Sequence, residues 1–261
     1  MSVHLFNDTD ITAIANAIRT KKGSSNTMTV SDMPTEIASI PSGGGTDYMA
    51  QRVQGTLSSY TIPNTCTQIS GYAFGGMPIT SITIPNSITN IIESAFRDCY
   101  SLEGITIPAS VTNIGSYAFH SCIHMTTATF NNTGCTFNLL SFGSCYVLTT
   151  LVNFSGATAN YNVPQACFDG TALVGNITLG EQCTCGNRAF NNTNSSGTLY
   201  IHLTQTDSSL LTSKYSFGAA TSTSTRSFNF DHCRLVVPVG MLSDYQTAFP
   251  NYSSIMIEET T

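Results

Sequence analysis

Apolar and polar residues alternate in short blocks that recur about every 23 residues along the middle of the chain. Thr-Ile-Pro begins at Thr61, Thr83 and Thr106, and a weaker Thr-Phe-Asn form begins at Thr129. The steps between these positions are 22, 23 and 23 residues. A period this short predicts an array of small stacked units, each of which buries its apolar face against its neighbours.

Further apolar positions recur at fixed offsets within each unit. The recurring residues are Ile69, Ile91, Ile114 and Phe137; Phe74, Phe96, Phe119 and Phe142, each after Ala or Ser; and Ile79, Leu102, Met125 and Leu148. A longer, degraded unit opens at Val152 with Phe168 at the aromatic position. Another opens at Thr178 with Phe190, and the pattern ends after Ile201.

The start of each unit has the pattern of a short strand. Ile82 and Ile84 flank Thr83, and this alternation indicates a strand with one buried side. Stacked units are therefore expected to form a parallel sheet. Proline follows each strand, where its missing N–H ends the ladder and turns the chain. Alanine then allows close passage of the backbone, and phenylalanine fills the interior.

The repeat resembles the BspA-like class of bacterial leucine-rich repeats. The matching residues in one unit are Ile107-Pro108, Val111 to Gly115, Ala118-Phe119, Cys122 and Met125. The resemblance covers residues 61–151 closely and 152–201 loosely. It implies a β-rich leucine-rich-repeat solenoid of about six coils, and a role in surface adhesion or recognition rather than one particular ligand.

The N-terminal residues have a helical pattern instead. Residues 8–23 predict an amphipathic helix with Ile11, Ile14 and Ile18 on one face, and a shorter helix follows Ser31. Pro41 to Gly45 has the composition of a flexible linker. These features divide the chain into a helical attachment module (1–41), a linker (42–47), the solenoid (48–201), and an insertion with a capping segment (202–261).

Residues 11–40 are similar to an N-terminal module of tail and baseplate proteins from phages and prophages of gut Firmicutes. Together with the absence of a signal peptide after Met1, this resemblance predicts a virion protein of the tail or baseplate. Residues 1–41 would contact other tail proteins, several copies would assemble as a homo-oligomer, and the solenoid would bind a host-surface glycan or protein. The alternative is a bacterial BspA-like adhesin at the cell surface.

The C-terminal segment is similar to the one that closes other BspA-like arrays. Leu235 to Gly240 predicts a last strand, and Tyr245 and Phe249 lie in a short helix after it. A terminal unit needs a polar outer face, so we expect this segment to cap the solenoid. Residues 202–232, rich in Ser and Thr, are expected to form an insertion or an irregular last coil.

Composition argues against several classes of partner. Only 9% of residues are charged, the net charge is −6, and Arg97 is the only basic residue between Arg52 and Arg188. A groove for nucleic acid must neutralise several phosphates, so we expect no nucleic-acid binding. No apolar run is long enough to cross a bilayer, so we expect no membrane insertion.

Reactive residues do not combine into a recognisable active site. Cys99, Cys122 and Cys145 share one offset and predict a ladder of buried thiols, although disulfides between adjacent coils stay open. The pair Cys183 and Cys185 lacks the spacing and the second pair of a zinc site. The trio Asp231 to Cys233 points to alternate faces if extended. We therefore expect no enzyme activity, metal or cofactor.

Contact with a ligand is predicted in the loops that follow the cysteine positions. The outward strand positions are mostly Ser, Thr and Gly, which offer no large anchor. Aromatic residues and arginine dominate binding hot spots, and the candidates are therefore Arg97, Tyr100, His120 and Tyr146. The alternative is that these are ordinary exposed side chains.

Overall fold

The structure is a computed structural model that describes residues 58–131, 134–154, 161–191, 197–216 and 232–260. The predicted helices of residues 1–41, with Ile11, Ile14 and Ile18, lie outside these ranges, and so does the predicted linker at 42–47. The repeat region and most of the C-terminal segment lie within them.

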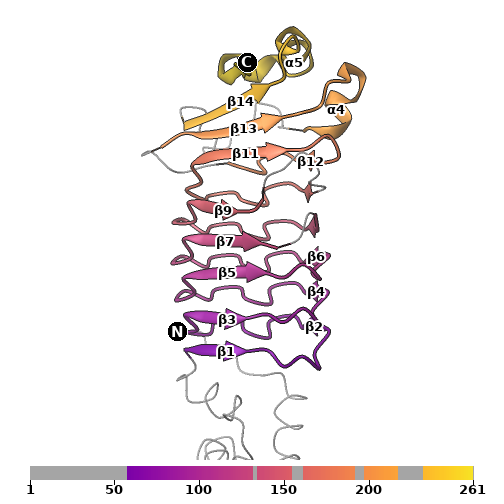
Figure 1. Cartoon of the computed structure of the whole chain (residues 1–261). Coiled ribbons are helices and arrows are strands. Elements are labelled where there is room, and N and C mark those ends of the chain that lie inside the picture. The colour runs from indigo at the N-terminus through magenta and orange to yellow at the C-terminus, as the bar shows by residue number, and fades with distance from the viewer. Residues whose placement is uncertain (1–57, 132–133, 155–160, 192–196, 217–231, 261) are drawn as a thin grey trace, which may run out of the picture.

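One side of the molecule is a ladder of parallel strands (Figure 1). The strands are β1 (Ser59–Thr61), β3 (Ser81–Thr83), β5 (Gly104–Ile107), β7 (Thr127–Phe130), β9 (Thr150–Val152), β11 (Gly175–Leu179), β13 (Leu199–Leu203), β14 (Cys233–Val237) and β15 (Met256–Glu258). Hydrogen bonds join them as β1-β3, β5-β7-β9 and β11-β13-β14-β15. The predicted parallel sheet of a leucine-rich-repeat solenoid is confirmed.

A second parallel ladder runs along another side of the coil (Figure 1). Its two-residue strands are β2 (Gln68–Ile69), β4 (Asn90–Ile91), β6 (Asn113–Ile114), β8 (Thr136–Phe137), β10 (Asn162–Val163) and β12 (Thr184–Cys185). Ile69, Ile91, Ile114 and Phe137 are in register and buried. The sequence repeat at this offset therefore comes from a separate sheet, which the strand pattern alone did not predict.

The Ala-Phe segment forms the third side of each coil and has an unusual backbone. The residues two before and two after each of the first five ladder phenylalanines have positive φ, for example Ser94 (56°) and Asp98 (60°) around Phe96. In that coil the N–H groups of these three residues donate to carbonyls of the next coil, at 2.7–2.9 Å. The residues with positive φ thus point every second N–H along the solenoid axis, where a carbonyl of the next coil accepts a hydrogen bond from it.

A column of phenylalanine rings fills the space between the three sides. Phe74, Phe96, Phe119, Phe142, Phe168 and Phe190 are buried, and neighbouring rings are stacked with centroids 4.8–5.4 Å apart. Offset or parallel aromatic pairs at this spacing contribute beyond their buried area. The predicted interior position of the repeated phenylalanine is confirmed, and the ladder continues into the degraded units.

The predicted cysteine ladder is also confirmed as a set of buried thiols. Cys99, Cys122 and Cys145 each donate Sγ–H to the carbonyl of the phenylalanine one coil earlier, at 3.0, 3.3 and 3.1 Å. All nine cysteines of the chain are free. Burial, followed by the neighbouring Cys145, raises the pKa of the Cys122 thiol well above its ordinary value. The thiols of the ladder therefore stay protonated and serve as hydrogen-bond donors to carbonyls in the interior.

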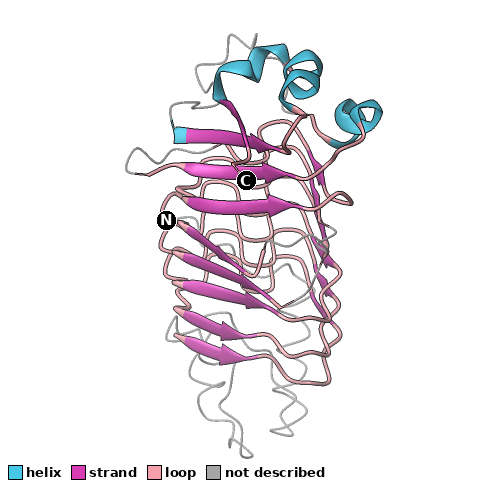
Figure 2. Cartoon of the chain, turned by 45° about the horizontal axis from the view of Figure 1, so that its top comes forward, coloured by secondary structure: helices cyan, strands magenta, loops and turns pink. Residues whose placement is uncertain are grey.

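Parallel pairing continues past Ile201, the residue where the sequence repeat ends. After β13, the helices η1 (Ser208–Leu210) and α4 (Leu211–Lys214) replace the regular turn, and β14 and β15 extend the sheet. The helices α5 (Leu242–Ala248) and η3 (Pro250–Ile255) lie at the C-terminal end of the array (Figure 2). The strand β14 and the helix α5 overlap the segments that the C-terminal pattern indicated, but β15 (Met256–Glu258) follows them, so the predicted strand is not the last one. The role of the segment as a cap stays a prediction.

Candidate recognition surfaces

The turn segments of the regular coils carry all four residues predicted to contact a ligand. The guanidinium carbon of Arg97 lies 5.5 Å from the ring centroid of Tyr117, one coil further. The Tyr117 and His120 rings meet edge to face with centroids 5.4 Å apart. Tyr117 therefore joins Arg97 to His120, a link that the sequence analysis missed.

Three further tyrosine side chains on the same kind of turn are largely exposed to solvent. Tyr100 is 51% exposed and Tyr146 is 53% exposed, and Tyr72, which was not predicted, is 57% exposed. Tyr100 and Tyr146 share one offset and are separated by two steps of the phenylalanine ladder, of 5.0 and 4.8 Å. We call Tyr72, Arg97, Tyr100, Tyr117, His120 and Tyr146 the tyrosine surface.

The chemistry of the tyrosine surface favours neutral rings around one positive charge. Burial, and next the charge of Arg97, lowers the pKa of His120, so its ring is neutral at neutral pH. Burial, and next the charge of Asp98, raises the pKa of Tyr100, so its phenol stays protonated. Asp98 lies beside Arg97, with Oδ2 3.5 Å from Nε, and partly offsets its charge.

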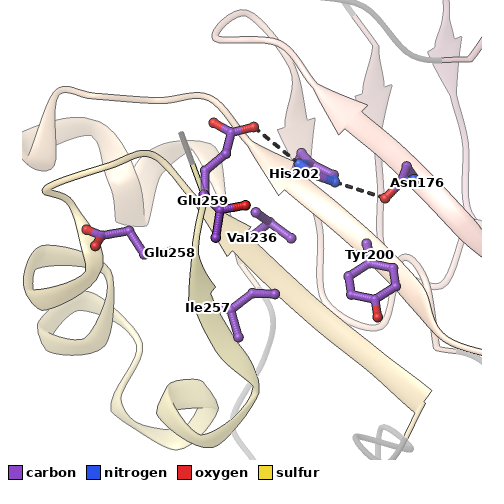
Figure 3. Close-up of a pocket in the computed structure, with 8 residues that line it drawn as sticks. Asn176, Tyr200, His202, Val236, Ile257, Glu258 and Glu259 are labelled. Atoms are coloured by element: carbon purple, nitrogen blue, oxygen red, sulfur yellow. Dashed lines mark hydrogen bonds and ion pairs between the residues drawn. The ribbon is translucent and has the colours of Figure 1, made fainter.

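A second candidate surface lies on the outer face of the C-terminal strands. The outward positions of β1 to β9 are mostly small, as predicted, whereas Asn176, Tyr200 and Arg234 form one row across β11, β13 and β14. The residues around a hollow of about 310 Å³ on this face are Asn176, Tyr200, His202, Val236, Ile257, Glu258, Glu259 and Thr260 (Figure 3).

A hydrogen bond and a histidine–carboxylate contact border the polar side of this hollow, which we call the sheet-face hollow. His202 Nε2 lies 3.0 Å from Asn176 Oδ1, and His202 Nδ1 lies 3.5 Å from Glu259 Oε1 (Figure 3). Glu258 turns away and accepts a hydrogen bond from the Gly240 N–H at 2.6 Å. The sequence analysis missed this site because its residues come from four separate segments, two of them beyond the recognisable repeat.

The other reactive residues lie in the interior of the molecule. Cys233 is fully buried in β14, and burial raises the pKa of its thiol to about 12. Asp231, its predicted neighbour, lies outside the described residues. Cys183 and Cys185 are buried, and Cys183 Sγ accepts the Tyr161 N–H at 3.3 Å. These positions suit packing and backbone pairing.

The described residues hold neither a metal-binding cluster nor a membrane-spanning helix. Among the described residues, no three His, Cys, Asp or Glu side chains gather in a way that could hold a metal ion. Within those residues there is also no helix long and apolar enough to cross a membrane.

Parallel strands stacked around an interior ladder define the class of this protein as a leucine-rich-repeat solenoid. More particularly, residues 52–162 match the family model of the BspA type leucine-rich repeat region in six copies. This stretch of the chain is thus a BspA-type repeat region, as the resemblance of its units predicted.

Two solved structures resemble the chain at 17% sequence identity. One is a leucine-rich cell surface protein from Faecalibacterium prausnitzii A2-165, with a TM-score of 0.34, and the match covers 59% of this chain and 56% of that one. The other is a leucine-rich repeat protein from Bacteroides ovatus ATCC 8483, with a TM-score of 0.37 and coverage of 81% and 62%. The chain thus spans less than two thirds of either. No curated protein matches it.

Proposed function

We propose that the protein is a non-enzymatic recognition protein of a bacterial cell surface, which binds a host-surface glycan or protein. The observation that carries this proposal is the tyrosine surface, where the turns that carry Arg97 also expose Tyr72, Tyr100 and Tyr146 to solvent. The BspA-type repeat region supports a surface role, since the resemblance implies adhesion and recognition.

The tyrosine surface has the composition and support that a binding site needs. Tyrosine and arginine are enriched among hot-spot residues, because they combine large contact area with hydrogen-bonding groups. The backbone under them is fixed between coils, since Phe96 and Asp98 donate to the next coil at 2.7 and 2.9 Å. A backbone held in this way loses little conformational entropy when a partner binds.

A role without catalysis is part of this proposal. The Cys233 thiol is buried and its pKa is raised to about 12, which opposes formation of a nucleophilic thiolate. The His120 ring contacts Tyr117, and its Nδ1 lies 2.8 Å from Ser121 Oγ. The nearby Cys122 thiol is buried, and burial raises its pKa well above the ordinary value. These surroundings support recognition through His120 rather than acid–base chemistry.

The phage tail is the second candidate, and it rests mainly on the resemblance of residues 11–40. In that case residues 1–41 would attach the chain to other tail proteins and the virion would hold several copies. The BspA-type match favours the cell surface over the tail. Neighbouring genes for tail, holin and lysin proteins, and the chain in purified particles, would favour the tail instead.

Binding of the full chain to cultured intestinal epithelial cells tests the proposed function. The double variant Tyr100→Ala, Tyr146→Ala removes two exposed rings without touching the core, and we expect it to lower cell binding at least about tenfold. Val239→Ala is the matched control, because Val239 is 58% exposed in the C-terminal segment. Equal binding by both variants and the parent would overturn the proposal.

A further inference from the structure

The sheet-face hollow differs chemically from the rest of the strand face. In the regular coils the outward positions are small, such as Thr106 and Thr129, which are in register. In the C-terminal sheet the corresponding rows carry His202, Val236 and Ile257 side by side. A sheet that serves only to stack coils has no need of an aromatic residue, a histidine and two aliphatic side chains facing outward.

The apolar residues of the hollow lie outside the interior core. Val236 is buried, at 5% exposure, yet it is absent from the cluster of core residues that contains its neighbours Leu235 and Val237. Ile257, its partner on β15, is 40% exposed, and Tyr200 on β13 is 36% exposed. Ile257 and Tyr200 are therefore available to the apolar face of a ligand, beside the buried Val236.

Polar groups of fixed orientation border these apolar residues. His202 lies between the oxygens of Asn176 and Glu259, and its Nε2–H donates to Asn176 Oδ1 at 3.0 Å. Among the described residues, the Asn176 Nδ2 and the second oxygen of Glu259 have no hydrogen-bond partner. The border thus presents an amide donor and a carboxylate acceptor on the two sides of His202, which suits two separate hydroxyl groups of one ligand.

Charge and size narrow the ligand further. Glu259 gives the border a negative charge, which disfavours acidic groups on a ligand. A volume of about 310 Å³ is at the lower end for small-molecule sites, and it suits one ring better than a folded protein.

We infer that the sheet-face hollow binds one pyranose ring of a neutral saccharide. The ring's apolar C–H face would lie on Val236, Ile257 and Tyr200, and its hydroxyls would bond to Asn176 and Glu259 (Figure 3). The inference extends the proposed recognition function, but its residues are separate from the tyrosine surface, so either can fail alone.

Calorimetric titration of the full chain with lactose, maltose, cellobiose and sialyllactose tests the inference. We expect at least one neutral disaccharide to bind, and the acidic sialyllactose to bind at least about tenfold more weakly than that disaccharide. Absence of heat from all three neutral disaccharides, or equal binding of sialyllactose, would overturn the inference.

Variants locate the site and separate it from the tyrosine surface. Tyr200→Ala should weaken binding of the disaccharide at least about tenfold, Ile257→Ala at least about threefold, and Tyr200→Phe should keep most of the affinity. Val239→Ala, at an exposed residue outside both surfaces, is the control and should leave disaccharide binding unchanged. Loss of disaccharide binding in Tyr100→Ala would place the saccharide on the tyrosine surface and overturn the assignment. Unchanged affinity in both Tyr200→Ala and Ile257→Ala, with the circular dichroism of the parent, would contradict the assignment. Loss of cell binding in the Tyr100 variants tests the proposed function and not the saccharide site.

Discussion

The regular coils from β1 to β9 and the C-terminal sheet from β11 to β15 share one strand ladder but differ in what they place on it. The regular coils repeat phenylalanine, cysteine and threonine at the same offsets, so their strand face is small and even. The C-terminal strands keep the buried residues and change the outward ones to Tyr200, His202 and Ile257. Stacking therefore constrains the residue types at interior positions. At outward positions and in turns the residue type can vary, so these positions can carry ligand-binding side chains.

The largest effect is expected from the middle of the phenylalanine ladder. Phe119 is fully buried and stacks on Phe96 and Phe142. Phe119→Ala should lower the free energy of unfolding by about 3–5 kcal/mol, because it leaves a cavity between two coils. Urea denaturation followed by circular dichroism measures this, and Tyr100→Ala should change the value by less than about 0.5 kcal/mol. Equal effects would mean that the ladder does not hold the regular coils together.

A smaller effect is expected where successive coils approach most closely. A Cβ at Gly115 would lie 2.5 Å from the Glu93 backbone nitrogen and 2.7 Å from the Ile92 carbonyl carbon. Gly115→Ala should therefore destabilise the chain by about 1–3 kcal/mol, because backbone must move. Gly76→Ser is the comparison, since a Cβ there meets nothing within 4 Å and Ser is found with positive φ at the same offset in Ser121 and Ser144. Urea denaturation measures both variants. A smaller loss of stability in Gly115→Ala than in Gly76→Ser would be inconsistent with close contact between the coils at Gly115.

The C-terminal segment can be tested through the buried hydroxyl of Tyr245. Its OH donates to the Gln205 carbonyl at 2.9 Å and so ties α5 to the chain after β13. Tyr245→Phe should cost about 1–2 kcal/mol, because the carbonyl is left buried and unpaired. Thermal melts of the variant and parent measure the loss. A cap role predicts that β14 and β15 exchange their amide hydrogens faster in the variant, and unchanged exchange there would argue against it.

The smallest effect should be a gain in stability within the regular coils. Ser94 has a φ of 56°, is fully buried, and within the described residues its hydroxyl has no hydrogen-bond partner. Ser94→Gly should stabilise the chain by about 0.5–1 kcal/mol, because glycine adopts positive φ without steric cost and the unpaired hydroxyl is removed. Ser94→Ala removes only the hydroxyl and should gain less. If Ser94→Gly destabilised the chain, the left-handed backbone would not be a source of strain.

Sequence reasoning could predict the interior of the regular coils because stacking repeats the same environment. Phe119 and Cys122 occur at fixed offsets, so their burial follows from the period alone. The positive φ at Ser94 and Asp98 could not be predicted, since neither residue is the glycine that usually marks this backbone. The second ladder could not be predicted either, because strands of two residues are too short to show an alternation of apolar and polar residues.

The candidate sites divide in the same way. Tyr100 and Tyr146 are found from sequence because they follow the repeated cysteine, and the structure leaves them exposed. Tyr117 needed the structure, because its contact with Arg97 joins different coils. Glu259 belongs to a segment without a recognisable repeat and Tyr200 to the degraded last unit, and only the pairing of β13, β14 and β15 brings them together.

The most direct test of the account compares turns and strands of the same coils in one adhesion measurement. Binding of the labelled full chain to intestinal epithelial cells is measured for Tyr100→Ala, Tyr146→Ala and for Thr106→Ala, Thr129→Ala. The account predicts at least about tenfold weaker binding for the tyrosine pair and unchanged binding for the threonine pair. Loss of binding in the threonine pair with retention in the tyrosine pair would contradict it, because recognition would then lie on the even strand face.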